Sequence, residues 1–275
     1  MLPDTPGSAL LNDGTALQLI GLGLYKVEPS DTERVVLDAL DVGYRLIDGA
    51  AFYGNEREVG DAVRESGLRG ELRVTSKAWG DPVMSYDETL REFDATERDL
   101  GFSPDVYLIH WPRASRNEYV NVWRALIRLR EEGRVRTIGV CSFGETELTR
   151  LIDETGVVPA LNQVESHPWL PQHGLREFHD AHGILTQAWS PLGRGRLMDD
   201  PVLLRIAAEH GVSVPQVVLR WHLQLGGAAV PKSTHRERLA QNIDLEGFAL
   251  TGEDMAAIAG LETGRRTGTN PADRQ

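Results

Sequence analysis

Gly21-Leu22-Gly23-Leu24-Tyr25-Lys26 stands near the start of the chain, where a doubly wound dinucleotide-binding fold would carry the pattern G-x-G-x-x-G. The third glycine of that pattern is missing, because Lys26 occupies its position. No phosphate-binding loop of the G-x-x-x-x-G-K-[ST] type occurs elsewhere in the chain. Gly193-Arg194-Gly195 is too short to replace either pattern, and we interpret it as a mobile loop. The sequence therefore argues against a doubly wound fold.

Short apolar runs and amphipathic helical stretches alternate along the rest of the chain. Ser30-Asp31-Thr32-Glu33 matches a capping box and predicts the start of a helix that Gly43 ends. Residues 117–132 repeat apolar side chains at three- and four-residue spacing, which predicts a helix that covers a sheet. Strands that are buried on both faces and alternate with helices form parallel sheets. We therefore predict an α/β fold of the (β/α)₈ TIM barrel type.

The predicted barrel fills one domain over residues 1–275, because single barrels of roughly 250 residues are common. A β-hairpin is expected ahead of it, around Asn12-Asp13-Gly14-Thr15. Residues 1–9 and 264–275 are expected to be flexible tails.

The composition is that of an acidic protein with a single cysteine. A formal net charge of -12 argues against binding to nucleic acid or to an anionic membrane surface. No segment approaches the roughly 18 apolar residues of a membrane span, and the start of the chain does not resemble a signal peptide. The lone Cys141 cannot form an intramolecular disulfide. We expect a cytoplasmic monomer without nucleic-acid or membrane partners.

The carboxyl ends of all barrel strands meet on one face, where the active sites of this fold lie. Apolar runs end there in Asp48, Lys77 and His110, and Tyr53 lies in the loop after Asp48. A buried ammonium group beside a phenol lowers the pKa of the phenol, and a carboxylate keeps that ammonium charged. A neutral imidazole can hydrogen-bond a substrate oxygen. The four side chains predict protonation of an oxygen that gains charge, as reduction of a carbonyl by a hydride donor requires.

Each of these residues also has an ordinary structural interpretation. Asp48 could cap a turn, Tyr53 could be a half-buried aromatic, and His110 could be a core histidine. Tyr44 and Tyr107 are rival phenols, but both lie inside strand-like runs. The combination on one barrel face favours the catalytic interpretation.

Several motifs carry a family pattern in the family's order. They are Gly43-Tyr44-Arg45-Leu46-Ile47-Asp48, Tyr53-Gly54-Asn55-Glu56, Leu108-Ile109-His110-Trp111-Pro112, Asn162-Gln163-Val164-Glu165 and Pro231-Lys232-Ser233-Thr234. From about Leu11 to Asn242 the chain resembles the aldo-keto reductases, most of all the bacterial 2,5-diketo-gluconate reductase branch. The resemblance implies a (β/α)₈ barrel, NADPH-dependent reduction of aldehydes or ketones, and a catalytic tetrad. In that family the tyrosine matching Tyr53 is the general acid, Lys77 and Asp48 tune it, and His110 orients the carbonyl.

The resemblance also implies where NADPH would bind. Gln163 would hydrogen-bond the nicotinamide carboxamide, and Trp189 would stack on the nicotinamide ring. The whole set of implied cofactor-binding residues is Ser142, Gln163, Trp189, Ser190, Leu192, Lys232, Ser233, Thr234, Arg238, Gln241 and Asn242. Thr234-His235-Arg236-Glu237 matches a capping box, so a helix N-terminus between Lys232 and Arg238 would face the 2′-phosphate. A plain capped helix with solvated cations is the alternative.

One motif departs from the family. Gly139-Val140-Cys141-Ser142-Phe143 stands where the family commonly has Gly-Val-Ser-Asn-Phe. Ser142 can donate one hydrogen bond to the cofactor, or its hydroxyl can serve a capping box over Ser142-Phe143-Gly144-Glu145. Cys141 is expected to be a buried, inert thiol.

The predicted substrate contacts are aromatic. Tyr25, Phe52, Trp79, His110 and Trp111 follow or flank strand ends and are expected to wall a pocket, with loop packing as the alternative. The short, polar C-terminal tail suggests that this pocket is open.

No metal site is expected. His173, His179 and His182 lack the spacing of known metal motifs and are expected to be surface histidines.

Three functions remain open at the level of the sequence. The first is an NADPH-dependent carbonyl reductase with a small-molecule substrate. The second is an NADPH-binding regulatory or redox-sensing barrel with weak activity, suggested by Cys141 and Ser142. The third is a barrel enzyme that forms a Schiff base on Lys77.

Overall fold

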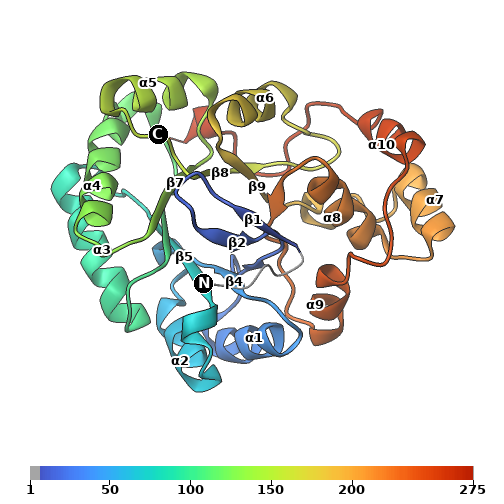
Figure 1. The fold of residues 1–275 in the computed structure, drawn as a ribbon, viewed down its shortest axis with the longest axis horizontal. Coiled ribbons are helices and arrows are strands. Elements are labelled where there is room, and N and C mark those ends of the chain that lie inside the picture. Colours follow the sequence, from blue (N-terminus) through green and yellow to red (C-terminus); the bar gives the residue numbers. More distant parts are fainter. Residues whose placement is uncertain (1–6, 275) are drawn as a thin grey trace.

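A computed structural model describes residues 7–274 and shows the predicted barrel (Figure 1). Eight parallel strands lie side by side in chain order: β3 (Leu22–Gly23), β4 (Leu46–Asp48), β5 (Arg73–Ala78), β6 (Val106–Ile109), β7 (Thr137–Cys141), β8 (Leu161–Glu165), β9 (Leu185–Trp189) and β10 (Ala228–Ala229). A parallel bridge between Ile20 and Ala229 joins the first strand to the last. The Gly21 amide donates to the Ala229 carbonyl at 2.9 Å, so the sheet closes on itself. The predicted fold is confirmed.

Helices follow the strands and surround the sheet (Figure 1). They are α1 (Pro29–Asp41), α2 (Glu56–Ser66), α3 (Tyr86–Leu100), α4 (Tyr119–Glu131), α5 (Glu145–Thr155), α6 (His173–His182), α7 (Pro201–His210), α8 (Val214–Gln224), α9 (Arg236–Ile243) and α10 (Gly252–Ala259). Alternation along the strands decides which side chains enter the barrel. On β5, for example, Ser76 bonds Glu56 of α2, while the next residue, Lys77, bonds Asp48 of β4. The alternation of side chains along β5 therefore directs Lys77 toward Asp48, on the side opposite to Ser76.

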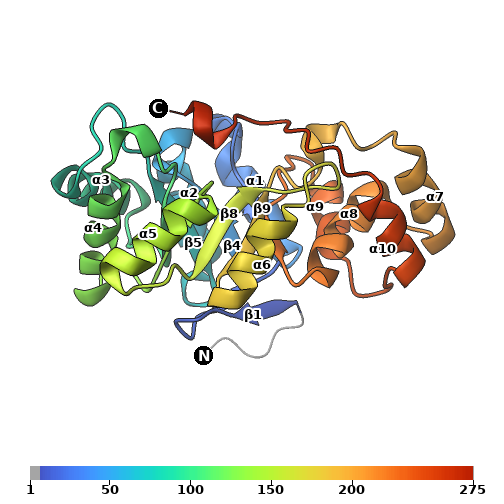
Figure 2. The same ribbon diagram turned by 90° about the horizontal axis from the view of Figure 1, so that it is seen from above.

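The predicted hairpin closes one end of the barrel. β1 (Ser8–Leu10) pairs antiparallel with β2 (Ala16–Gln18). Leu17 of β2 is fully buried and belongs to the same hydrophobic cluster as Leu46 and Leu108 of the barrel strands. Figure 2 shows this hairpin at the end opposite to the C-terminal segment. Of the predicted N-terminal tail 1–9, residues 1–6 lie outside the described residues, and Ser8 already belongs to β1. The predicted functional face therefore lies at the end of the barrel that the hairpin does not close.

Two predicted capping boxes are wrong, and the alternative capping role of Ser142 is not found. α1 begins at Pro29, with Glu28 as its N-cap, because proline fixes the dihedral that the first helical position needs. α9 begins after His235, because the Ser233 hydroxyl accepts the His235 amide at 3.2 Å and makes a turn there. α5 takes Gly144 as its N-cap, and the Glu147 carboxylate accepts the Gly144 amide at 3.1 Å, so Ser142 has no capping role.

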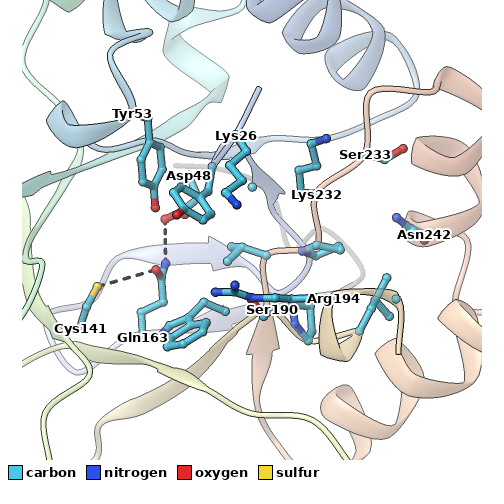
Figure 3. A pocket seen from close by; sticks show the side chains of 18 of the residues that line it. Lys26, Asp48, Tyr53, Cys141, Gln163, Ser190, Arg194, Lys232, Ser233 and Asn242 are labelled. Carbon is cyan, nitrogen blue, oxygen red and sulfur yellow. Dashed lines mark hydrogen bonds between the residues drawn. The ribbon is translucent and has the colours of Figure 1, made fainter. Parts of the chain in front are cut away.

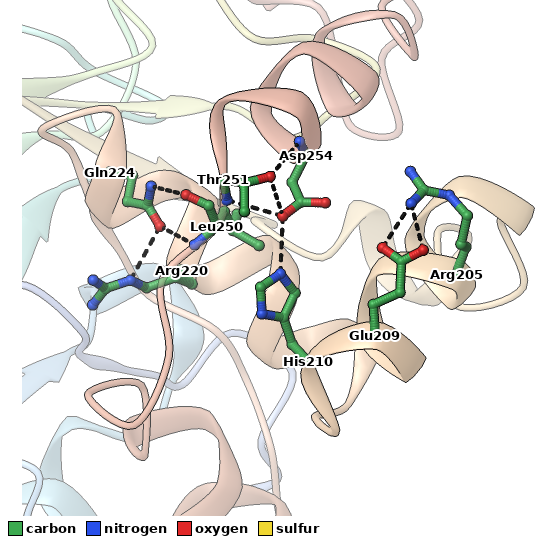
Figure 4. Close-up of polar contacts among 8 residues, drawn as sticks. All are labelled: Arg205, Glu209, His210, Arg220, Gln224, Leu250, Thr251 and Asp254. Atoms are coloured by element: carbon green, nitrogen blue, oxygen red, sulfur yellow. Dashed lines mark hydrogen bonds and ion pairs between the residues drawn. The ribbon is translucent and has the colours of Figure 1, made fainter.

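Polar contacts tie the C-terminal helices together (Figure 4). Asp254 accepts the Thr251 amide at 2.9 Å and lies 2.9 Å from Nε2 of His210, which links α10 to α7. The Gln224 side chain of α8 donates to the Leu250 carbonyl at 2.9 Å and accepts the Leu250 amide at 2.7 Å. Leu250 and Thr251, directly before α10, are thus tied to α8 and, through Asp254, to α7.

Within residues 7–274, no single helix is long and apolar enough to cross a membrane. α7 and α8 satisfy length and composition only as a pair, and they are bent by 89° at the break between them.

Candidate active site

Lys77 is the centre of a buried cluster at the carboxyl ends of β4 and β5. Its Nζ donates to both Asp48 carboxylate oxygens at 2.9 and 3.0 Å and to the Gly49 carbonyl at 2.8 Å. The Tyr53 hydroxyl lies 3.4 Å from the same nitrogen. Lys77 is fully buried and Asp48 is 3% exposed. The structure brings together three of the four residues that the sequence placed here.

The electrostatics of this cluster keep Lys77 charged. Burial alone lowers the pKa of Lys77, but the nearby Asp48 and Tyr53 outweigh burial, so the pKa is raised above its ordinary value. An ammonium group that is held by three oxygens does not act as a free amine nucleophile.

For Tyr53, the effect of Lys77 has the predicted sign, but burial outweighs it. Burial raises the pKa of Tyr53 well above its ordinary value, and the Lys77 charge, which lowers it as predicted, offsets only part of this rise. Desolvation of the phenolate therefore outweighs the single ammonium in this structure. The phenol is protonated at neutral pH and can act as a proton donor.

His110, directly after β6, lies across from Tyr53. The ring centroids of His110 and Tyr53 are 5.8 Å apart, and Trp79 and Trp111 lie 5.1 and 6.3 Å from the imidazole. Burial, followed by the charges of Lys77, Arg274 and Arg113, lowers the pKa of His110 well below its ordinary value. The imidazole is neutral, as the sequence predicted.

These groups face a cavity of about 900 Å³. Every predicted cofactor and substrate contact lines it: Tyr25, Phe52, Trp79, His110, Trp111, Ser142, Gln163, Trp189, Ser190, Leu192, Lys232, Ser233, Thr234, Arg238, Gln241 and Asn242. Asp48 and Tyr53 line it as well, whereas Lys77 lies behind them. Lys77 therefore reaches the cavity only through Tyr53 and Asp48.

Tyr25, Phe52 and Trp79 form an aromatic wall near the tetrad. The rings of Phe52 and Trp79 stack with centroids 3.8 Å apart, and Tyr25 lies 5.3 Å from the ring of Tyr53. Tyr25 and Phe52 remain 42% and 47% exposed. The wall is thus open toward one side of the cavity.

Gln163 links the tetrad to the floor of the cavity (Figure 3). Its Nε2 donates to Asp48 at 2.7 Å and to Gln187 at 2.8 Å, and the Cys141 thiol lies 3.7 Å from its Oε1. Burial raises the pKa of Cys141 well above its ordinary value, and the thiol is 2% exposed. The predicted burial of Cys141 is confirmed, and the raised pKa disfavours the reactive thiolate form.

Ser142 and Trp189 contact each other. The Trp189 indole N–H donates to the Ser142 hydroxyl at 3.2 Å, which fixes the plane of the indole. Ser142 has a φ of 61°, in the left-handed region. The hydroxyl that the sequence assigned to the cofactor or to a helix cap thus orients the neighbouring ring.

The far end of the cavity carries cations and a helix N-terminus. Lys232 and Arg238 line it, and neither has an ion-pair partner within residues 7–274. Arg236, by contrast, pairs with Asp38 and Asp41 on the outer surface. The first N–H groups of α9 have no side-chain cap, which leaves them available to an anion.

Sequence reasoning missed Lys26, Arg194 and Arg274, which also line the cavity. Gly193–Gly195, which the sequence suggested is a mobile loop, forms a 3₁₀ turn with Gly193 buried. The glycine pattern was the available signal, because Arg194 has a φ of 55° between two glycines in the left-handed region.

The C-terminal tail makes specific contacts, although its composition predicts flexibility. The Thr267 amide and hydroxyl and the Gly268 amide donate to Glu165 of β8 at 2.6, 2.8 and 2.9 Å. A side chain at Gly268 would come within 2.5 Å of the Trp189 ring, so the tail lies directly on that residue. Arg274 lies over the Trp79 ring at 4.8 Å. The tail covers part of the cavity that the sequence suggested was open.

The histidines do not all follow the prediction. His179 is fully buried, with Nε2 3.0 Å from the Asn162 amide and Nδ1 2.8 Å from the Thr186 hydroxyl, so its assignment to the surface is wrong. His173 and His182 are exposed. Among the described residues, no group of three or more potential ligands is placed to hold a metal ion.

Comparisons with known proteins agree with this geometry. The model of the Aldo/keto reductase family matches residues 19–263. An aldo-keto reductase of Mycolicibacterium smegmatis is 49% identical over 95% of both chains, and 2,5-diketo-D-gluconic acid reductase B of Corynebacterium sp. is 46% identical over 96% of both. A variant of Gox0644, solved in complex with NADPH, superimposes with a TM-score of 0.94 at 41% identity, covering 99% of this chain and 100% of that chain. The chain belongs to the aldo/keto reductase family, as its motifs predicted.

Proposed function

We propose that Tyr53 protonates the substrate oxygen in this enzyme and that His110 and Lys77 support that step. The chain is an NADPH-dependent oxidoreductase that reduces aldehydes or ketones to alcohols. NADPH supplies the hydride for this reaction when it is bound. The chain itself must hold the carbonyl group of the substrate and protonate its oxygen.

Tyr53 has the right protonation state and surroundings for the proton donor. Its hydroxyl is protonated at neutral pH because burial raises its pKa. Once it has donated the proton, the phenolate lies 3.4 Å from the Lys77 ammonium. At an effective dielectric constant of about 20, that attraction is about 5 kcal/mol. Lys77 therefore stabilises the charge that appears on Tyr53 as the proton leaves.

Asp48 and His110 have different tasks. Asp48 fixes the Lys77 ammonium through two hydrogen bonds and keeps it charged in a buried place. His110 is neutral, so its imidazole can hydrogen-bond the carbonyl without competing as an acid. The aromatic residues Phe52, Trp79 and Trp111 would hold the apolar part of the substrate beside it.

The residues at the far end fit NADPH. Lys232, Arg238 and the uncapped N-terminus of α9 form a donor set suited to a phosphate group, which favours NADPH over NADH. Trp189 offers a flat face to the cavity, 6.4 Å from the Trp111 ring centroid, and Ser142 holds its indole. Gln163 would have to share its side-chain Nε2 between the nicotinamide carboxamide and the two groups that already accept from it, Asp48 and Gln187.

The observation that carries the assignment is the Asp48–Lys77–Tyr53 cluster beside His110. Tyr53→Phe should retain NADPH binding and lose about 100-fold to 10,000-fold in turnover of a simple aldehyde, measured by NADPH absorbance. Tyr86→Phe, in the first turn of α3 and outside the cavity, is the control. Unchanged turnover in Tyr53→Phe would refute the assigned role.

The two alternative functions lose their support in the geometry. A redox-sensing role would need an accessible, acidic thiol, but Cys141 is buried and burial raises its pKa. A Schiff base on Lys77 would need a neutral amine open to the cavity, but Lys77 is charged and lies behind Asp48 and Tyr53. Borohydride trapping in the presence of an aldehyde should leave Lys77 unmodified.

We further propose a cytoplasmic monomer that takes a small-molecule carbonyl substrate and has no nucleic-acid or membrane partner. The net charge of -12 and the lone, buried Cys141 support the absence of such partners and the cytoplasmic location. Light scattering during size-exclusion chromatography should give a mass near 30.4 kDa.

A further inference from the structure

The C-terminal tail crosses the barrel where β8 and β9 end. Glu165 of β8 and Trp189 of β9 are direct partners in the parallel ladder between these strands. Glu165 accepts the amides of Thr267 and Gly268 at 2.6 and 2.9 Å, and the Thr267 hydroxyl adds a third hydrogen bond at 2.8 Å. The backbone of Gly268 is therefore anchored on the strand that neighbours Trp189.

Position 268 requires glycine for reasons of space. The φ of Gly268 lies outside the left-handed region, whereas Gly264 in the same tail has a φ of 69°. A Cβ atom at position 268 would lie 2.5 Å from Cη2 and 2.6 Å from Cζ3 of Trp189, and 3.0 Å from Nη2 of Arg194. Carbon atoms in contact prefer separations of about 3.5–4.0 Å. A single methyl group at this position would thus overlap with the indole ring.

Relief of this overlap requires a movement of about 1 Å by the tail or by the indole. Three hydrogen bonds to a buried carboxylate hold the tail at Thr267 and Gly268. The indole is held by one neutral hydrogen bond, from its N–H to the Ser142 hydroxyl at 3.2 Å. Hydrogen bonds to a charged group are the stronger kind, so we expect the indole to move and the tail to stay.

Trp189 lines the cavity, and in the proposed function its flat face stacks on the nicotinamide ring. Gly268 is not among the described residues that line the cavity, so its effect on a bound cofactor must pass through a neighbour. The shortest distances at position 268 are those to Trp189. The position of the indole therefore depends on the absence of a side chain at Gly268.

We propose that Gly268 is a positioning residue, which lets the tail set the place of the Trp189 indole and thereby of the nicotinamide half of NADPH. The proposal rests on the proposed function, because that function supplies the cofactor. The adenosine half, which lies toward Lys232 and Arg238, is independent of this contact.

Gly268→Ala tests the proposal with two ligands, NADPH and adenosine 2′,5′-bisphosphate. The second ligand has the adenosine and the 2′-phosphate but no nicotinamide ring. In calorimetric titrations, Gly268→Ala should raise the Kd for NADPH about 5-fold to 50-fold, because overpacking of a fixed site has a cost of this size. The Kd for adenosine 2′,5′-bisphosphate should change less than about twofold. Gly252→Ala, at the start of α10, is the control, because no atom lies within 4 Å of the added methyl group.

A smaller ring at position 189 provides the decisive variant. Phenylalanine lacks the Cζ3 and Cη2 atoms that would meet the methyl group of Gly268→Ala. Trp189→Phe alone should weaken NADPH binding, because it removes part of the flat face and the contact with Ser142. Adding Gly268→Ala to Trp189→Phe should then change the Kd for NADPH less than about twofold, since two residues in contact have non-additive effects. The same cycle, measured as the free energy of unfolding in urea, should show this coupling without any cofactor.

Unchanged NADPH affinity in Gly268→Ala, equal losses for both ligands, or the same loss in the presence of Trp189→Phe would overturn the proposal. Should Gly268→Ala fail to fold, recovery of the folded state in the double variant supports the contact, and failure of the double variant to fold contradicts it. These titrations do not depend on turnover. A wild type that binds NADPH but reduces no aldehyde contradicts the proposed function alone, and a wild type that does not bind NADPH contradicts both proposals.

Discussion

Replacing Glu165 by glutamine should release the C-terminal tail from the barrel and leave the Asp48–Lys77–Tyr53 cluster in place. Glu165 is 1% exposed at the end of β8 and accepts three hydrogen bonds from Thr267 and Gly268. Glutamine has almost the same shape but carries no charge. One of its two terminal groups is a donor, which cannot accept an amide N–H.

The pKa of Glu165 gives the magnitude. Burial alone raises this pKa, but the hydrogen bonds from His167, Thr267 and Gly268 outweigh burial and lower it to about 2. The difference from the ordinary value of 4.5 corresponds to about 3 kcal/mol in favour of the charged form. His167 contributes part of this free energy, and its contribution does not depend on the tail. We therefore assign about 2 kcal/mol of it to the contacts with the tail. Opening of the tail should therefore become roughly 30-fold more frequent in Glu165→Gln.

Hydrogen exchange measured by mass spectrometry tests this value. Amides of residues 264–274 should lose about 30-fold of their protection in Glu165→Gln, while β5 should keep its protection. Glu209→Gln is the control, because the exposed pair of Glu209 with Arg205 contributes at most about 0.5 kcal/mol. Unchanged exchange of the tail in Glu165→Gln would refute the reasoning.

The same carboxylate predicts a pH dependence. A folded-state pKa below the unfolded value stabilises the tail fully above about pH 4.5, and this stability is lost as the pH falls toward 2. After correction for intrinsic exchange, protection of the wild-type tail should fall across that window. In Glu165→Gln the protection should no longer depend on this titration.

Three further predictions concern other buried or charged groups. Lys77→Met should leave the Asp48 carboxylate buried without its partner and lower the free energy of unfolding in urea by about 3–5 kcal/mol. Lys77→Arg should fold but have a lower kcat, because guanidinium does not reproduce the ammonium geometry. Full activity in Lys77→Arg would contradict the role assigned to Lys77. Lys232→Ala should raise KM for NADPH at least about 10-fold with kcat and KM for NADH little changed, and an equal effect on both cofactors would argue against a 2′-phosphate contact. Burial lowers the pKa of His222 to about 3. The stability gained by keeping this imidazole neutral is therefore present above about pH 6.5 and declines by roughly 1.4 kcal/mol per pH unit below that. Urea unfolding at pH 7 and pH 5 should show this loss of stability, and the loss should be smaller in His222→Gln.

The tetrad could be predicted because strand ends are local features. Asp48, Lys77 and His110 each follow an apolar run, and barrel geometry brings the ends of all such runs to one face. The same logic placed Ser142, Gln163, Trp189 and the residues after β10 along one cavity, and the motifs assigned them to a known family.

The starts of helices were predicted less well. The capping-box pattern at Ser30 fails because the preceding Pro29 begins the helix, and the one at Thr234 fails because Ser233 forms its own turn. These outcomes depend on a single residue outside the four-residue pattern, so a pattern of that length does not decide them.

By itself, the sequence determined the barrel, the family and the identity of the side chains at the strand ends, because hydrophobic alternation and strand-end chemistry are recorded within a few neighbouring residues. Only the tertiary structure decided the net pKa of Tyr53, because desolvation depends on everything that surrounds the phenol. It also decided the role of the C-terminal tail. Glu165 and Thr267 are separated by 102 positions, and the guanidinium of Arg274 meets the Trp79 ring only after the chain has closed the barrel and returned across it.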